Sequence, residues 1–269
     1  MKVRELLRDG VGRYILKKVM GKDIPWLYLY EDMDAPLKAV KYYKMVKEEG
    51  YPVEYLFNEV EFYGERFCIR EGVLIPRDET EVVLEECFKV IRRNRWIKKV
   101  VDVGTGSGVL AILIKKEFPH LEVIGTDISP TAIEVATQNS KLHGVEVQFK
   151  LVQFFDEKGV DLVVSNPPYL EKRHPLPNRF EPPEAFYGGG EEGLDTTLQL
   201  LQKCNDYGVK GAVIEISPYQ KERLYRWLKE KKWVVDYYFF KDYLPVWRGV
   251  VVSLSPLLQL PPIRVGGKE

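Results

Sequence analysis

The stretch VVDVGTGSGVLAI, residues 100–112, decides the fold. Its apolar first part predicts a buried strand, and the apolar residues after the last glycine predict a helix. Gly104, Gly106 and Gly108 lie in the turn between them, where glycine allows the backbone to bend sharply and to approach a ligand closely. Their G-x-G-x-G spacing differs from the G-x-G-x-x-G of dinucleotide-binding folds. The stretch therefore predicts a βα unit with a ligand-binding turn.

Strands and helices alternate on both sides of this turn. Further strands are expected at about 123–127, 145–151, 161–165 and 212–217. Helices are expected after Asp78 and at about 108–117, 130–143, 194–206 and 219–231. Strands separated by helices predict a parallel, doubly wound α/β sheet. Two last strands, near 234–240 and 249–254, have no helix between them, which predicts an antiparallel pair at one edge.

The rest of the chain predicts a second, smaller domain. Apolar residues recur with a helical period between residues 6 and 19, and a second helix is expected from 34 to 49. An alternating, aromatic-rich stretch follows and predicts a β-hairpin. The predicted order is a helical domain, a hairpin linker, the main α/β domain and a C-terminal tail, over 1–54, 55–75, 76–255 and 256–269.

The composition is that of a globular protein with no dominant charge. Of the 269 residues, 45% are hydrophobic, and 40 basic residues balance 40 acidic ones, so no net field favours nucleic acid or a membrane. Three scattered cysteines and three histidines show no ligand spacing, so we expect reduced thiols and no metal site. Together with the lack of a signal-peptide pattern or a long apolar stretch, this favours the cytoplasm.

Two further elements are expected beside the glycine turn. Asp127 ends the next predicted strand, where its carboxylate can accept hydrogen bonds from ribose hydroxyls. SNPPYL, residues 165–170, ends the strand at 161–165. Ligands of such sheets bind outside the carboxyl ends of the strands, so all three elements should meet at one site. The alternative for the glycine turn is a tight βα connection with a helix-capping aspartate.

This combination resembles the S-adenosyl-L-methionine site of the Rossmann-like methyltransferases. The resemblance implies S-adenosyl-L-methionine as the methyl donor and S-adenosyl-L-homocysteine as the product. It also implies a Rossmann-like methyltransferase sheet, here with a small N-terminal helical domain joined by a β-hairpin.

The NPPY residues suit methyl transfer to a planar amino group. Such a nitrogen is a poor nucleophile because its lone pair is delocalised. The Asn166 side-chain oxygen and the Pro167 carbonyl can accept its two N–H groups and so favour a pyramidal nitrogen. The prolines, including Pro168, stiffen the loop, and Tyr169 offers a flat face to an amide or a base. The simpler alternative is a strand that merely ends at two prolines.

NPPY alone does not show whether the acceptor is a base amine or a glutamine amide, but other stretches of the sequence do. Together with NPPY, five stretches resemble the HemK-type protein-(glutamine-N5) methyltransferases: YLFNEVEFYGERF (55–67), VLIPRDETEVVLE (73–85), EPPEAFYGGGEEGLD (181–195), EISPYQ (215–220) and KDYLPVWRGVVV (241–252). The resemblance implies methylation of the glutamine in the Gly-Gly-Gln loop of peptide-chain release factors. It further implies that the helical domain recognises the release factor and that the enzyme is a monomer.

The resemblance also implies roles for individual residues. The catalytic residues would be Asn166, Pro167 and Tyr169. The substrate glutamine would contact Asn166, Pro167, Pro168, Tyr169 and Glu181. The donor would contact Thr80, Gly104, Thr105, Gly106, Gly108, Asp127, Gln153 and Asn166. Gln153 stands where relatives usually carry an acidic residue for the adenine amino group. Arg77 is expected either near the donor or as an ion-pair partner.

Two other functions fit parts of the pattern. An N6-adenine nucleic-acid methyltransferase also uses NPPY, but it would ordinarily need a basic groove, so we expect no direct nucleic-acid substrate and no membrane partner. A non-catalytic module could keep the fold and hold the donor as a structural ligand. Intact Asn166 argues against the module.

Overall fold

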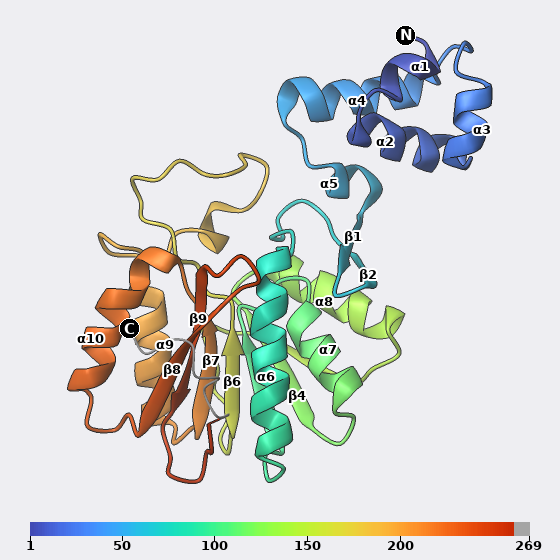
Figure 1. The fold of residues 1–269 in the computed structure, drawn as a ribbon. Helices are drawn as coiled ribbons and strands as arrows, with labels where there is room; N and C mark the ends of the chain where they lie inside the picture. Colours follow the sequence, from blue (N-terminus) through green and yellow to red (C-terminus); the bar gives the residue numbers. More distant parts are fainter. Residues whose placement is uncertain (261–269) are drawn as a thin grey trace. The chain divides into compact units, whose positions relative to one another are not determined.

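The computed structural model describes residues 1–260 and divides the chain into two compact units, residues 1–59 and residues from 60 onward (Figure 1). The predicted tail falls in part on residues 261–269, which lie outside the described residues. Across the described part of the chain, every helix is too short or too polar to cross a membrane.

The first unit is helical, as predicted. It contains α1 (Val3–Leu6), α2 (Gly10–Met20), α3 (Ile24–Leu29), α4 (Leu37–Glu49) and α5 (Val53–Phe57). Its core is formed by Val3, Leu6, Leu7, Ile15, Leu16, Leu27, Ala35 and Ala39.

The helical pattern between residues 6 and 19 is split between two helices. The Asp9 carboxylate accepts a hydrogen bond from the Gly12 amide at 2.8 Å and so caps the start of α2. A Cβ atom at Gly12 would lie 1.9 Å from the Leu6 main-chain oxygen. The glycine that weakens the helical pattern is therefore the residue that lets the backbones of α1 and α2 touch.

A β-hairpin forms within the predicted 55–75 segment. Its strands are β1 (Glu59–Phe62) and β2 (Glu65–Cys68), and Phe62 and Phe67 are buried. Asn139 of the main domain ties the end of β2 in place. Its side chain bonds the Cys68 amide at 2.6 Å and the carbonyls of Cys68 and Ser107 at 2.9 and 2.8 Å. The hairpin is thus anchored beside the glycine turn.

The main domain is built on a seven-stranded sheet in the order β5-β4-β3-β6-β7-β9-β8. The strands are β3 (Lys99–Val103), β4 (Glu122–Asp127), β5 (Gln148–Leu151), β6 (Leu162–Ser165), β7 (Gly211–Glu215), β8 (Asp236–Lys241) and β9 (Trp247–Ser253). The first five are parallel, whereas β9 pairs antiparallel with β7 and β8. The predicted fold class and antiparallel edge pair are confirmed.

Helices cover both faces of this sheet (Figure 1). One face carries α6 (Glu81–Arg93), α7 (Val109–Glu117) and α8 (Pro130–Leu142), and the other carries α9 (Asp195–Asp206) and α10 (Lys221–Glu230). Short 3-10 turns occur at η1 (Asp78–Thr80), η2 (Pro183–Ala185) and η3 (Pro218–Gln220). Leu200, Leu224 and Leu228 pack against inward residues of β3, β6, β7 and β9. Both faces are buried, which explains why the central strands are apolar throughout.

The strand order reverses between β3 and β6. The chain runs outward from β3 through β4 to β5 and then returns to place β6 on the other side of β3. Val103 pairs with Ser165, so the residues that follow, Gly104 and Asn166, leave the sheet side by side. A switch point of this kind opens a crevice at the carboxyl ends of the strands.

Candidate active site

A cavity of about 380 Å³ lies at the carboxyl ends of β3, β4 and β6. Most of the predicted site residues line it: Thr80, Gly104, Thr105, Gly106, Asp127, Gln153, Asn166, Pro167 and Pro168. Apolar side chains complete the wall, among them Leu110, Ile128, Val152 and Phe154. Gly108, Tyr169 and Glu181 lie outside this lining. The structure therefore brings together segments that are far apart in sequence.

The glycine turn is held open by Asp127. Gly104 and Gly106 have φ angles of 71° and 55°, a region that favours glycine. The Asp127 carboxylate accepts hydrogen bonds from the Gly106 amide and the Ser129 amide, both at 2.9 Å. Burial raises the pKa of Asp127, and these amide bonds oppose the shift. A Cβ atom at Gly106 would meet nothing within 4 Å, so the turn leaves open space at the cavity.

Gly108 has a different structural role from Gly104 and Gly106. Its φ is 85°, and a Cβ atom there would lie 3.0 Å from the Ala136 Cβ and 3.1 Å from the Ile112 Cδ1. This glycine permits close packing of α7 against α8. Its predicted contact with the donor stays a prediction.

Asp102 was missed by the sequence reasoning. It lies in β3, is 1% exposed, and lines the cavity. Its Oδ2 accepts hydrogen bonds from the Thr105 hydroxyl at 2.6 Å and the Ala111 amide at 3.2 Å. Its Oδ1 has no hydrogen-bond partner within residues 1–260. Burial raises the pKa of Asp102 to about 7, against the effect of the two hydrogen bonds.

An unpaired buried carboxylate oxygen at a cavity fits a cationic group. The methionine end of S-adenosyl-L-methionine carries an ammonium group, so the residues present fit the donor. The signal that could have identified Asp102 is an acidic residue inside an apolar strand, directly before the glycine turn.

Asn166 is oriented by Thr80. The Asn166 Nδ2 donates a hydrogen bond to the Thr80 Oγ1 at 3.0 Å. Thr80 is at the end of η1 and only 3% exposed, whereas Asn166 is half-buried at the cavity. Because the amide nitrogen faces Thr80, the Oδ1 oxygen is the atom that remains to accept a hydrogen bond from a ligand. This is the polarity that the proposed chemistry requires.

The NPPY loop is clamped from outside by the segment 181–195. The Leu170 amide donates to the Phe186 oxygen at 2.6 Å, and the Gly188 amide donates to the Leu170 oxygen at 3.1 Å. A Cβ atom at Gly188 would lie 2.4 Å from the Pro168 oxygen, so glycine is needed for this close approach. Gly193, with φ of 64°, approaches the Tyr169 oxygen equally closely.

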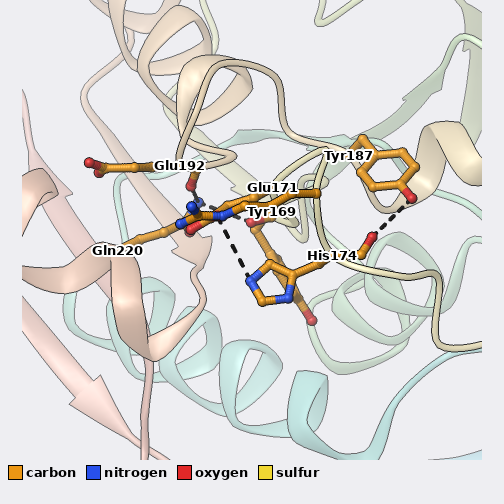
Figure 2. A network of polar contacts seen from close by, with 7 residues as sticks. Tyr169, Glu171, His174, Tyr187, Glu192 and Gln220 are labelled. Atoms are coloured by element: carbon orange, nitrogen blue, oxygen red, sulfur yellow. Dashed lines mark hydrogen bonds and ion pairs between the residues drawn. The ribbon is translucent and has the colours of Figure 1, made fainter.

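Gln220 joins the same two segments. Its Nε2 donates to the Gly193 oxygen at 2.8 Å. It also lies 3.3 Å from the main-chain oxygens of Tyr169 and Glu192, to which it donates (Figure 2). Figure 2 also shows the Tyr187 hydroxyl bonded to the His174 oxygen, at 3.1 Å, farther along the loop. The sequence reasoning noted the EISPYQ stretch but assigned Gln220 no part.

Glu181 and Arg77 form an ion pair away from the cavity. Glu181 is 3% exposed, and its carboxylate accepts from the Ile75 amide at 3.0 Å and the Arg77 guanidinium at 2.6 Å. Of the two parts considered for Arg77, the ion pair is the one observed. Glu181 connects the segment 181–195 to the stretch before η1 through Ile75 and Arg77. Its predicted contact with the substrate stays a prediction.

Comparison with known proteins gives a consistent answer. Residues 78–178 match the methyltransferase small domain family. The chain is 34% identical to the release factor glutamine methyltransferase of Dictyoglomus turgidum over 242 residues, which is 84% of each chain. It is 35% identical to the enzyme of that name from Geobacter sulfurreducens over 207 residues, 72% of this chain and 71% of that one.

This chain belongs to the release factor glutamine methyltransferase family. The resemblance inferred from the motifs is thereby confirmed, and so is the methyltransferase class of the enzyme. The aligned region of the Dictyoglomus relative covers most of this family member, so the likeness is not confined to the donor-binding sheet.

Solved structures agree on the fold of this family member. The hMettl16 catalytic domain in complex with the MAT2A 3'UTR hairpin 6 aligns with a TM-score of 0.58 at 12% identity, over 83% of this chain and 82% of that chain. Human methyltransferase 10 domain containing protein aligns with a TM-score of 0.51 at 13% identity, over 80% of this chain and 94% of that chain. At these identities the likeness concerns the fold alone.

Proposed function

We propose that this protein transfers a methyl group from S-adenosyl-L-methionine to the side-chain amide nitrogen of the glutamine in the Gly-Gly-Gln motif of peptide-chain release factors. The observation that carries the proposal is the orientation of Asn166, whose amide nitrogen is bonded to Thr80 while its oxygen remains for a ligand. The family membership supports the choice of a glutamine amide over an adenine amine.

The donor is bound along the carboxyl ends of β3 and β4. When bound, S-adenosyl-L-methionine supplies a methyl group on a positively charged sulfur. Asp102 would accept from its ammonium group, the glycine turn would hold its methionine end, and Asp127 would accept from its ribose hydroxyls. Gln153, exposed at the rim, offers an amide oxygen to the adenine amino group.

The acceptor amide is held at the end of β6. The Asn166 Oδ1 and the Pro167 carbonyl accept its two N–H groups, which favours a pyramidal nitrogen with its lone pair toward the methyl carbon. The nitrogen–carbon bond forms as the sulfur–carbon bond breaks, and the nitrogen then loses a proton to water. The chain's residues thus supply orientation and need no strong general base.

The partners follow from the same proposal. The release factor is the protein substrate, recognised in part by the helical unit, and the enzyme acts as a monomer without a nucleic-acid substrate. Cys68, Cys87 and Cys204 are free thiols in the structure, which suits a cytoplasmic enzyme.

Labelled methyl transfer tests the proposal. Purified protein, S-adenosyl-L-methionine with a labelled methyl group, and a bacterial release factor are expected to yield one labelled glutamine, located by peptide mass spectrometry. The matched control is the same release factor with that glutamine replaced by glutamate. Labelling of DNA or RNA, with none on the release factor, would contradict the proposal and favour the adenine alternative.

A further inference from the structure

The NPPY loop has few main-chain groups that can hold it in place. Pro167 and Pro168 have no N–H group to donate. The Pro167 carbonyl must stay free for the substrate amide in the reaction proposed above. Within residues 1–260, the main-chain groups of residues 167–169 make a single hydrogen bond, in which the Tyr169 oxygen accepts from the Gln220 side chain at 3.3 Å. The rigidity of this loop therefore depends on a residue 51 positions away.

Two side chains hold the loop, one at each end. At the first end, the Asn166 Nδ2 donates to the Thr80 Oγ1 at 3.0 Å. At the other end, Gln220 holds the Tyr169 carbonyl. Pro167, whose carbonyl we assign to the substrate amide, lies between these two contacts in the chain. A shift at either end would move that carbonyl relative to the reacting nitrogen.

Gln220 is also the donor for three buried carbonyl oxygens. Its Nε2 donates to the oxygens of Tyr169, Glu192 and Gly193, so two N–H groups serve three acceptors (Figure 2). No other group among the described residues 1–260 donates to these oxygens. The main chains are close together, because a Cβ atom at Gly193 would lie 2.3 Å from the Tyr169 oxygen. Without Gln220, buried carbonyls that lack a donor would face one another, which costs free energy and drives the two segments apart.

The groups around the Gln220 amide fix its orientation. Its Oε1 accepts from the Ser217 main-chain N–H at 3.1 Å. A main-chain N–H only donates and a main-chain carbonyl only accepts, so a reversed amide would face a donor with a donor and three oxygens with an oxygen. The side chain is 2% exposed, which leaves little access for water to correct such a mismatch. An ionised glutamate has the same shape but no donor, so the position requires an amide.

We propose that Gln220 is a positioning residue for methyl transfer, which holds the Tyr169 carbonyl and thereby fixes the Pro167 carbonyl at the acceptor site. The proposal rests on the function proposed above. Gln220 is not among the residues that line the donor cavity, so its effect on the reaction passes through the NPPY loop. Loss of Gln220 should therefore lower turnover and leave donor binding intact.

Gln220→Glu is the first test, and Asn94→Asp is its matched control. Asn94 is also a buried amide, 1% exposed, and its Nδ2 donates to the oxygens of Val90 and Gln259 at 2.9 and 2.8 Å. Its Oδ1 accepts from the Gln259 amide at 2.8 Å. Asn94 follows α6 and precedes β3, so it lies toward the amino ends of the strands, away from the site. Both changes place a buried carboxyl against carbonyl oxygens, but only Gln220→Glu affects the NPPY loop.

The two variants should differ in turnover. At saturating donor, we expect kcat of Gln220→Glu on a release factor to fall on the order of 10²-fold, the effect of misplacing a reacting group by about an ångström. Asn94→Asp should keep the wild-type kcat per folded molecule. Donor affinity, measured by calorimetry, should stay within error of the wild type in both. Gln220→Met and Asn94→Leu repeat the comparison without a new charge, in case a carboxyl variant fails to fold.

The pH dependence separates positioning from stability. Burial raises the pKa of a carboxyl group, so the folded state of each carboxyl variant binds more protons than the unfolded state. The free energy of unfolding of both variants therefore falls as pH rises through this range. Only in Gln220→Glu does protonation return a donor to the Tyr169 carbonyl. Its kcat should rise as pH falls, relative to the wild type, whereas the kcat of Asn94→Asp should follow the wild-type profile.

Hydrogen exchange tests the position of the loop without a substrate. The Leu170 amide donates to the Phe186 oxygen at 2.6 Å, and the Gly188 amide donates to the Leu170 oxygen at 3.1 Å. Both amides lie directly after or beside the Tyr169 carbonyl. They should exchange faster in the Gln220 variants than in the wild type and at the wild-type rate in the Asn94 variants.

These measurements can overturn the inference in two ways. One is wild-type kcat in the Gln220 variants, or a loss of kcat that the Asn94 variants match. The other is unchanged hydrogen exchange at Leu170 and Gly188. A wild-type enzyme inactive on every release factor would instead reject the proposed function, and faster exchange in the Gln220 variants would then still support a positioning role in the NPPY loop.

Discussion

The two loops that meet at the cavity are built in different ways. The glycine turn, residues 104–108, follows β3 and takes its shape from its own left-handed φ angles and from two carboxylates, Asp102 and Asp127. The NPPY loop, residues 166–169, follows the neighbouring strand β6 and is held by side chains and main-chain groups from three distant segments.

This difference matches the task of each loop. A donor with many polar groups can be bound by main-chain amides and a few acceptors, which a short local sequence provides. Methyl transfer requires that one amide nitrogen be aligned within a fraction of an ångström, and such alignment depends on rigid surroundings. The glycine turn, for which we propose donor binding, is therefore shaped by its own residues and by the two strands beside it. The NPPY loop, for which we propose acceptor binding, depends on segments that are far away in the sequence. Variants in the two loops should fail in different ways.

Asn166→Ala should have the largest effect. It removes the acceptor at the reacting nitrogen, and we expect kcat to fall by about 10²–10³-fold, as when one preorganised hydrogen-bond partner is removed from an active site. Donor affinity, measured by calorimetry, should be unchanged because the glycine turn is intact. Equal losses in kcat and donor affinity would remove the distinction between the loops.

Gly188→Ala should damage the acceptor loop without touching a reacting group. The new Cβ would lie 2.0 Å from the Gly193 oxygen and 2.4 Å from the Pro168 oxygen, so the NPPY loop must shift. We expect kcat to fall on the order of 10²-fold at normal donor affinity. Gly144→Ala is the control, since it has a φ of 63° but nothing within 4 Å of its Cβ, and it should keep turnover.

Asp127→Asn should damage the donor loop alone. One acceptor oxygen becomes a donor that faces the amide of Gly106 or Ser129. We expect the donor Kd to rise by about 10- to 100-fold, the range for a lost hydrogen bond to a charged group. At saturating donor, kcat should stay near the wild-type value. A normal Kd with a reduced kcat would contradict the assigned role.

Glycine-to-alanine changes within the turn should give the smallest effects in this series, measured as losses in the free energy of unfolding. Gly108→Ala adds a Cβ 3.0 Å from Ala136 at a φ of 85°, and we expect the free energy of unfolding to fall by about 1–3 kcal/mol. Gly106→Ala has free space, so the cost should be about 1–2 kcal/mol from its backbone alone. Urea unfolding measures both. A larger loss in the free energy of unfolding for Gly106→Ala than for Gly108→Ala would contradict the assignment of Gly108, and not Gly106, to helix packing.

Much of the fold followed from local patterns. The turn at 100–112, the alternation of apolar strands with helices, and the helix-free last pair of strands were enough to predict the sheet and its antiparallel edge. These features depend on periodicity and on glycine, which act over a few residues. The helical pattern between residues 6 and 19 was less reliable, because the cap at Asp9 and the contact of Gly12 with Leu6 divide it into two helices.

The sequence by itself predicted which residues would contact ligands, namely the glycines, Asp127 and Asn166, because their residue types and spacing indicate that chemistry. Only the tertiary structure decided what holds them. Thr80 meets Asn166 across 86 positions, and Glu181 meets Ile75 across 106. In the sequence, Asp102 and Glu215 are single acidic residues in apolar strands. The structure shows that both are buried and that each has one carboxylate oxygen with no hydrogen-bond partner within residues 1–260. The physical reason is that a hydrogen bond depends on distance in space, and folding alone sets that distance.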